Sequence, residues 1–163
     1  MAKNKEEKTN VMRVLEQKKI AYTAHTYPHE EGVAVDGVTV AQSMGFDPAV
    51  VFKTLVARGA SKQYYVFDVP VAANLDLKKA AKAVGEKSIE MIHQKELLPL
   101  TGYVHGGCSP VGMKKLFPTV IHKTAEDLET MIVSAGKIGY QVELAPRDLA
   151  ALVRAQFADI TVE

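Results

Sequence analysis

The segment that most constrains the fold is the apolar run at residues 50–56, which carries a single lysine, Lys53, at its centre. β-Branched and aromatic residues dominate the run, and turn-forming residues stand on both sides of it, so we expect a strand here. An ammonium group is seldom buried without a partner, because removing it from water is costly. We therefore expect Lys53 to reach a wet cleft, a carboxylate or a ligand. The run leaves one alternative open, an edge-strand lysine that keeps sheets from associating.

A second apolar run, residues 63–69, follows after a short polar loop, and this spacing predicts an antiparallel hairpin. Other elements are expected from β-branched clusters or from capped segments with helical periodicity. The expected strands are residues 20–27, 119–121, 130–133 and 138–144, and the expected helices are residues 9–19, 38–44, 76–83, 93–98 and a closing helix from Pro146 through Phe157. Because the strands do not alternate regularly with helices, we expect an α+β fold with a mixed, largely antiparallel sheet surrounded by helices.

The chain length of 163 residues suits a single domain over residues 1–163, long enough to bury a core without disulfide support. The one cysteine, Cys108, excludes an internal disulfide and is typical of a reducing compartment. No apolar run approaches the ~18 residues of a transmembrane helix, and residues 1–8 are too polar for a signal peptide. We therefore expect a cytoplasmic protein that does not enter a membrane.

The charge balance limits how the chain can contact nucleic acid. A net charge of +1 is far from the strongly basic composition of proteins that grip a duplex by its phosphates. If nucleic acid is a ligand, we expect the contact to be local.

Metal and cysteine chemistry find little support in the pattern of residues. The five histidines are scattered, and no cluster of cysteines or carboxylates accompanies them, so we expect no metal site and no cofactor. A cysteine nucleophile is an open alternative, since Cys108 lies three residues from a potential base, His105. No third group is evident to orient that base, and a lone cysteine is usually a small buried apolar residue.

A glycine-rich segment contains Gly106, Gly107 and Gly112 within seven residues. Glycines let backbone amides approach a bound group without side chains intervening. The spacing matches neither a P-loop nor a dinucleotide-binding fingerprint. The amides of Gly106 and Gly107, together with Lys53, can hold an anion or an ester carbonyl. The alternative is that these glycines only serve a tight bend.

Five short motifs occur in order along the chain: HTYPHE, VFKTLV, LDLKKAAKAVG, TGYVHGGCSPVGMKK and SAGKIGYQVELAPRDL. With them the chain resembles the YbaK-type family of trans-acting aminoacyl-tRNA deacylases, relatives of the editing domain inserted in bacterial prolyl-tRNA synthetases. The resemblance covers about residues 9–160. It implies a mixed β-sheet or barrel with surrounding helices, and hydrolysis of misacylated tRNA, chiefly Cys-tRNA(Pro).

The resemblance also implies roles for individual residues. Lys53 matches the essential lysine of the family, which contacts the phosphate or ribose of the terminal adenosine, and Gly106 matches a glycine whose backbone faces the aminoacyl carbonyl. Relatives can carry an aspartate where this chain has Gln141, so a role that needs a carboxylate charge there stays open. The expected substrate-binding residues are Tyr27, Thr54, Gly107, Ser134, Gly136 and Gln141.

The implied mechanism needs no catalytic triad. The thiol of the substrate attacks its own ester carbonyl, and the protein positions the substrate and stabilises the oxyanion with backbone amides. The implied partners are the 3′ end of tRNA(Pro) and prolyl-tRNA synthetase. Two alternatives remain: a deacylase for Ala-tRNA or another misacylated tRNA, and a non-catalytic module that binds a nucleotide or an RNA end.

Overall fold

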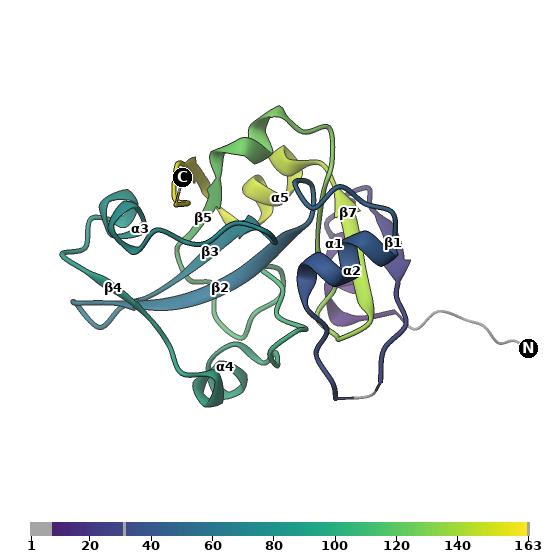
Figure 1. Cartoon of the computed structure of the whole chain (residues 1–163), viewed down its shortest axis with the longest axis horizontal. Helices are drawn as coiled ribbons and strands as arrows, with labels where there is room; N and C mark the ends of the chain where they lie inside the picture. Colours follow the sequence, from purple (N-terminus) through teal and green to yellow (C-terminus); the bar gives the residue numbers. More distant parts are fainter. Residues whose placement is uncertain (1–7, 31, 163) are drawn as a thin grey trace, which may run out of the picture.

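The computed structural model describes residues 8–30 and 32–162, so the prediction about the polar N-terminus falls almost wholly outside the described residues. The strands form two sheets (Figure 1). The three-stranded sheet has the order β1 (Thr23–Thr26), β7 (Tyr140–Leu144) and β6 (Met131–Ser134). The five-stranded sheet has the order β4 (Ile89–Met91), β2 (Phe52–Gly59), β3 (Tyr64–Pro70), β5 (Thr119–His122) and β8 (Gln156–Ala158).

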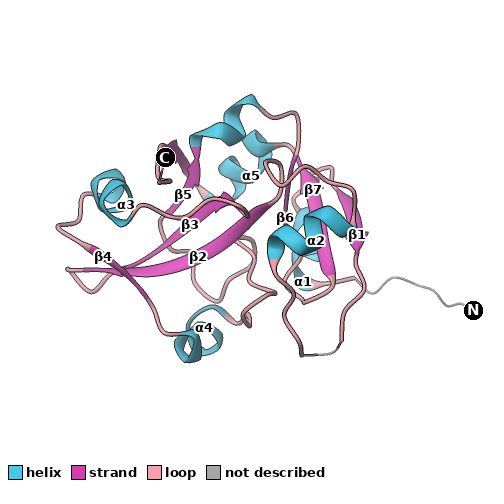
Figure 2. Ribbon diagram, viewed as in Figure 1, coloured by secondary structure: helices cyan, strands magenta, loops and turns pink. Residues whose placement is uncertain are grey.

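Among the described residues, five α-helices and one 3₁₀-helix surround these sheets (Figure 2). The predicted α+β fold is thus confirmed, with open sheets rather than a closed barrel among the described strands. None of the described helices is long and apolar enough to cross a membrane. The helices are α1 (Asn10–Gln17), α2 (Gly37–Ser43), α3 (Leu77–Val84), α4 (Gln94–Thr101), α5 (Pro146–Val153) and the 3₁₀-helix η2 (Lys123–Asp127).

The ends of α1 and α3 follow from their capping residues. Thr9 Oγ1 accepts a hydrogen bond from the Met12 amide at 3.2 Å, and the Asp76 carboxylate accepts from the amides of the first turn of α3. Gly85 ends α3 in the left-handed conformation, with φ of 76°, which costs a glycine little. The predicted helix boundaries are confirmed at these positions.

The β2–β3 hairpin is antiparallel, as predicted, with Lys53 opposite Val69 and Thr54 opposite Asp68. It separates two apolar clusters. The larger cluster lies on one face of the hairpin and includes Phe52, and the smaller one lies on the other face and includes Phe67. Side chains that follow one another along β2 therefore enter different environments.

The start of β2 joins the two sheets. Val51 forms a parallel bridge with Ile132 at the start of β6, and the Ile132 amide donates to the Val50 carbonyl at 2.9 Å. The short strand β4 pairs only with residues 57–59 of β2. The outer edge of β2 is therefore not covered by β4 beside Lys53, where the two sheets meet.

The closing helix is shorter than predicted. Arg154 takes the left-handed conformation, with φ of 58°, and ends α5, so Phe157 lies in β8 instead of the helix. Strand β8 pairs in parallel with β5, opposite Ile121. This pairing gives backbone groups on one side of residues 156–158 hydrogen-bond partners, which helical periodicity alone does not anticipate. The prediction for Phe157 was wrong, and β4 was not predicted.

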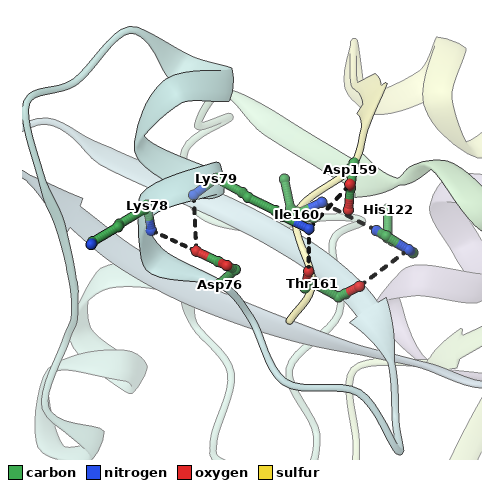
Figure 3. Close-up of polar contacts among 7 residues, drawn as sticks. All are labelled: Asp76, Lys78, Lys79, His122, Asp159, Ile160 and Thr161. Atoms are coloured by element: carbon green, nitrogen blue, oxygen red, sulfur yellow. Dashed lines mark hydrogen bonds and ion pairs between the residues drawn. The ribbon is translucent and has the colours of Figure 1, made fainter. Parts of the chain in front are cut away.

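A buried histidine fastens the segment after β8 to the end of β5 (Figure 3). The Ile160 amide donates to Nδ1 of His122 at 3.2 Å, and Nε2 lies 3.3 Å from Thr161 Oγ1. Because Nδ1 accepts, it carries no proton, and the ring is the neutral tautomer with its proton on Nε2. Burial lowers the pKa of His122, opposed by the nearby Asp159 and assisted by Lys123 and Lys79.

This contact predicts an acid-sensitive contribution to stability. Because the folded-state pKa of His122 is depressed, the unfolded chain binds the proton first, and stability is lost as pH falls from above ~6.5 towards the folded-state pKa. In His122→Asn a side-chain carbonyl can replace Nδ1 as the acceptor without titrating. We expect Tm to fall less between pH 8 and pH 5 in this variant than in the wild type. In the control variant His105→Asn, which changes an exposed histidine, Tm should depend on pH as it does in the wild type. An equal fall of Tm with pH in His122→Asn and the wild type would contradict the prediction.

Candidate active site

A cavity of about 550 Å³ lies where the two sheets meet. Its wall draws on β2, on Tyr27 directly after β1, on the end of β6, on β7, and on the glycine-rich loop between α4 and β5. The fold thus brings together residues as far apart in the sequence as Tyr27 and Gln141. The expected site residues that line it are Tyr27, Lys53, Thr54, Gly106, Ser134 and Gln141.

Lys53 is half-buried in this cavity. Burial lowers the pKa of its ammonium group, and the carboxylate of Asp36, which caps α2 and also lines the cavity, partly opposes that shift. Within residues 8–30 and 32–162, Lys53 takes part in no ion pair. A partly desolvated cation without a contacting carboxylate is suited to receive an anionic group from a ligand. Lys53 does lie on a strand edge, as expected for a lysine that keeps sheets from associating. Its side chain, however, faces a cavity.

Thr54 projects from the opposite face of β2, because neighbouring strand residues point to opposite sides. Its hydroxyl donates to Oδ1 of Asp68 at 2.6 Å across the β2–β3 pair. The Asp68 side chain is fully buried, and its second oxygen, Oδ2, has no hydrogen-bond partner. Burial raises the pKa of Asp68 to about 7, although the hydrogen bond from Thr54 partly lowers it. The cavity therefore borders both faces of β2, with Lys53 on one side and Thr54 on the other.

The two adjacent glycines of the glycine-rich loop have different roles. Gly106 is exposed, lines the cavity and has a φ of 91°, a conformation that favours glycine. Gly107 is buried outside the cavity lining, and its amide donates to the Val104 carbonyl at 2.9 Å. The Gly107 amide is thus already used inside the protein, so the structure does not support the predicted substrate contact at this residue.

Ser134 and Gln141 face each other across the β6–β7 pair, and both line the cavity. Gln141 is 7% exposed, and its Oε1 is buried without a hydrogen-bond partner. Gly136 lies outside the lining. Its φ is 92°, and a Cβ there would meet Tyr103 at 2.9 Å. Gly136 therefore shapes the β6–β7 turn, and its amide donates to Ser134 Oγ at 3.1 Å, so the predicted direct contact with substrate is not supported.

The sequence did not identify Asp36 or Asp68 as site residues. Asp36 precedes α2 in a recognisable capping position, so its role as a helix cap was open to sequence reasoning, whereas its place at the cavity was not. Asp68 carries the same local signal as Lys53, a charged residue within an apolar strand, and this signal was overlooked.

The structure disfavours Cys108 as a nucleophile. Cys108 lines the cavity but is 8% exposed, and burial and the neighbouring Asp68 raise the pKa of its thiol to about 12. The expected base, His105, is exposed and has no hydrogen bond to the thiol among the described residues. A thiol with this pKa is protonated at neutral pH and is a poor nucleophile. No group of three potential metal ligands occurs among the described side chains.

A family comparison decides which class of protein this cavity belongs to. The profile of the aminoacyl-tRNA editing domain matches residues 32–152, a span that includes Lys53, Gly106 and Gln141. The chain belongs to the aminoacyl-tRNA editing domain family.

Individual members and folds support this assignment. A protein from Enterococcus faecalis strain V583, provisionally named Cys-tRNA(Pro)/Cys-tRNA(Cys) deacylase EbsC, is 46% identical over 164 residues, covering 100% of this chain and 99% of that protein. A solved structure described provisionally as a trans-editing enzyme for prolyl tRNA synthetase superposes with a TM-score of 0.79 and 26% identity, over 94% of this chain and 95% of that one. A hypothetical protein, APE2540, shares the fold, with a TM-score of 0.82 and 19% identity over 93% and 99% of the two chains.

These comparisons confirm the resemblance inferred from the five motifs and the type of fold it implied. Editing domains hydrolyse the ester that joins an amino acid to tRNA. The cavity of this chain is lined by a cationic side chain and by an exposed glycine. In this editing domain the two groups come from β2 and from the glycine-rich loop, which the fold brings to one place.

The shape of the cavity predicts a specific effect of Gly106→Ala. A Cβ at this position would lie 2.7 Å from the Cβ and 3.2 Å from the Cα of Ala34, which also lines the cavity. The 33–35 loop must therefore shift, and we expect hydrolysis of aminoacyl-tRNA to fall by about 10- to 100-fold.

Gly85→Ala is the matched control. Gly85 also has a positive φ, of 76°, but a Cβ there meets nothing within 4 Å. Both variants should lose roughly 1–2 kcal/mol of stability from the unfavourable backbone conformation. Only Gly106→Ala should lose activity, and equal activity in the two variants would contradict a role for the Gly106 position in shaping the site.

Proposed function

We propose that this protein is a trans-editing deacylase that hydrolyses the ester of misacylated Cys-tRNA(Pro). The observation that carries the proposal is the half-buried ammonium group of Lys53, which has no ion-pair partner among the described residues and shares one cavity with the exposed Gly106 backbone. The 46% identical protein named for deacylation of Cys-tRNA(Pro) and Cys-tRNA(Cys) supports the choice of amino acid.

In this proposal Lys53 anchors the tRNA end. A phosphate or ribose oxygen of the terminal adenosine would replace the water that the half-buried ammonium has lost. The Gly106 amide would then donate to the aminoacyl carbonyl oxygen as negative charge develops on it. Tyr27, Ser134 and Gln141 would form the walls around the aminoacyl group, since all three line the cavity.

The proposed chemistry uses the thiol of the substrate as the nucleophile. Its sulfur forms a bond to the ester carbonyl carbon, the bond from that carbon to the ribose oxygen breaks, and the ribose oxygen takes up a proton as the thiol loses one. Water then opens the cyclic thioester and regenerates cysteine. The inert thiol of Cys108 and the exposed position of His105 favour this route over a nucleophile from the protein.

The partner and cellular place follow from this proposal. A net charge of +1 suits a protein that contacts only the single-stranded 3′ end and leaves recognition of the tRNA body to another protein. We infer that prolyl-tRNA synthetase is that other protein, that the two meet in the cytoplasm, and that residues 9–160 act as one editing domain.

Removing the ammonium group tests the anchoring role. Lys53→Ala should lower kcat/KM for Cys-tRNA(Pro) by at least about 30-fold, since losing one partner of a desolvated charged contact costs roughly 2–5 kcal/mol. The Tm should change little, because Lys53 makes no ion pair among the described residues. Lys78→Ala removes an exposed lysine and should keep full activity. Near-normal turnover by Lys53→Ala would contradict the role of Lys53.

A panel of aminoacyl-tRNAs tests the choice of substrate. With Cys-, Ala-, Ser- and Pro-tRNA, we expect hydrolysis of Cys-tRNA to be fastest, because only cysteine brings a thiol that can attack its own ester. A size filter alone would separate these amino acids by only about 10- to 200-fold. A preference for Ala-tRNA would contradict the thiol mechanism, and binding without ester loss across the panel would indicate a non-catalytic module.

A further inference from the structure

The buried carboxyl group of Asp68 has no role in the chemistry described so far. It lies on β3 directly opposite Thr54, and Thr54 is its one hydrogen-bond partner among the described residues. Cys108 is close enough for the Asp68 charge to raise the pKa of the thiol, and both Thr54 and Cys108 line the cavity. Asp68 therefore lies immediately behind one wall of the cavity.

A carboxylate in this position is poorly compensated by the protein. Its exposure is 0%, one oxygen has no donor, and burial raises its pKa to about 7. Among the described residues no cation acts against that shift. A buried charge is tolerated when it is paired and hydrogen-bonded. A ligand that brings a positive charge or a strong donor close to Asp68 would compensate this charge.

The hydrogen bond between Thr54 and Asp68 determines which hydrogen-bonding groups the cavity presents on the Thr54 face of β2. The Thr54 hydroxyl has one proton, and that proton is donated to Oδ1 of Asp68. The two lone pairs of Thr54 Oγ1 can then only accept hydrogen bonds. Gln141 Oε1, on the same cavity, is a second buried acceptor without a donor. The Thr54 side of β2 therefore suits a group with several N–H donors, whereas Lys53 on the other side suits an anion.

An aminoacyl ester at the end of tRNA has this polarity, with an α-ammonium group on the amino acid and a phosphate on the nucleotide. We propose that Thr54 accepts a hydrogen bond from the α-ammonium group of the aminoacyl ester and that Asp68 is the positioning residue that orients Thr54 and supplies the opposing charge. The inference rests on the proposed function and adds the group by which the aminoacyl moiety is held. It makes the enzyme selective for a free, protonated amine.

The test compares Cys-tRNA with its α-hydroxy analogue, 3-mercaptolactyl-tRNA, which keeps the thiol and the size but has no positive charge. Each enzymatic rate is divided by the spontaneous hydrolysis rate of the same ester, since the ammonium group itself activates the ester. We expect the wild type to prefer the amine by at least about 30-fold, as for a desolvated charged contact. Asp68→Asn and Thr54→Val should each reduce this preference to less than 5-fold. Thr54→Ser keeps the hydroxyl group and should therefore retain the preference for the amine.

A pH profile separates charge recognition from a merely structural role. Because the pKa of Asp68 is about 7, the preference of the wild type should decrease as pH falls below 7, and that decrease should be absent in Asp68→Asn. Tm values establish whether each variant folds. If Asp68→Asn does not fold, the comparison of Thr54→Val with Thr54→Ser still tests the inference.

Equal normalised rates on the two esters in the wild type would overturn the inference, as would full preference retained in Thr54→Val. Failure of the proposed function has a different signature, because the wild type would then hydrolyse neither ester. In that case the affinities of 3′-cysteinylamido-adenosine and its α-hydroxy counterpart decide the inference. A preference for the amine that Thr54→Val abolishes supports the subsite, and equal binding overturns it.

Discussion

The alternation of side chains along β2 is the constraint on which the site depends. Lys53 and Thr54 are neighbours in the chain, yet a strand directs them to opposite faces, and the cavity borders both. This is possible because β4 covers only residues 57–59 of β2 and because the start of β2 meets β6 through the Val51–Ile132 bridge. A longer β4 would close the edge of β2, and without the bridge to β6 there would be no second wall.

Much of the fold was open to prediction because its signals are local. The capping residues Thr9 and Asp76 identify their helices, and the short loop after residue 59 identifies the β2–β3 hairpin. The elements that were missed depend on partners far away in the sequence. Strand β8 exists because β5 offers a parallel edge, and the short strand β4 exists because β2 has an unpaired edge at residues 57–59. Neither pairing leaves a periodic pattern in the segment itself.

The residues of the candidate site likewise differ in how far their roles follow from local sequence. Lys53 was found because a charge inside an apolar strand demands an explanation. The glycines were harder to assign, since a glycine can serve a ligand or the fold and the sequence does not distinguish the two. Gly106 faces the cavity, whereas Gly107 bonds to Val104 and Gly136 makes room for Tyr103. Asp68 also lies within an apolar strand, and its complete burial and unpaired oxygen show why that position matters.

The positions of Lys53 and Asp68 explain why neither charge is satisfied inside the protein. Placed on one face of the hairpin, a lysine and an aspartate across the β2–β3 pair would form an ion pair and neutralise each other. Here the register sets Asp68 opposite Thr54 and Val69 opposite Lys53, so the two charges lie on different faces of the hairpin. An unsatisfied buried polar group costs roughly 1–3 kcal/mol. A ligand with an anion at one end and a cation at the other would offset both costs at once, and the strand between Lys53 and Asp68 keeps them from offsetting each other.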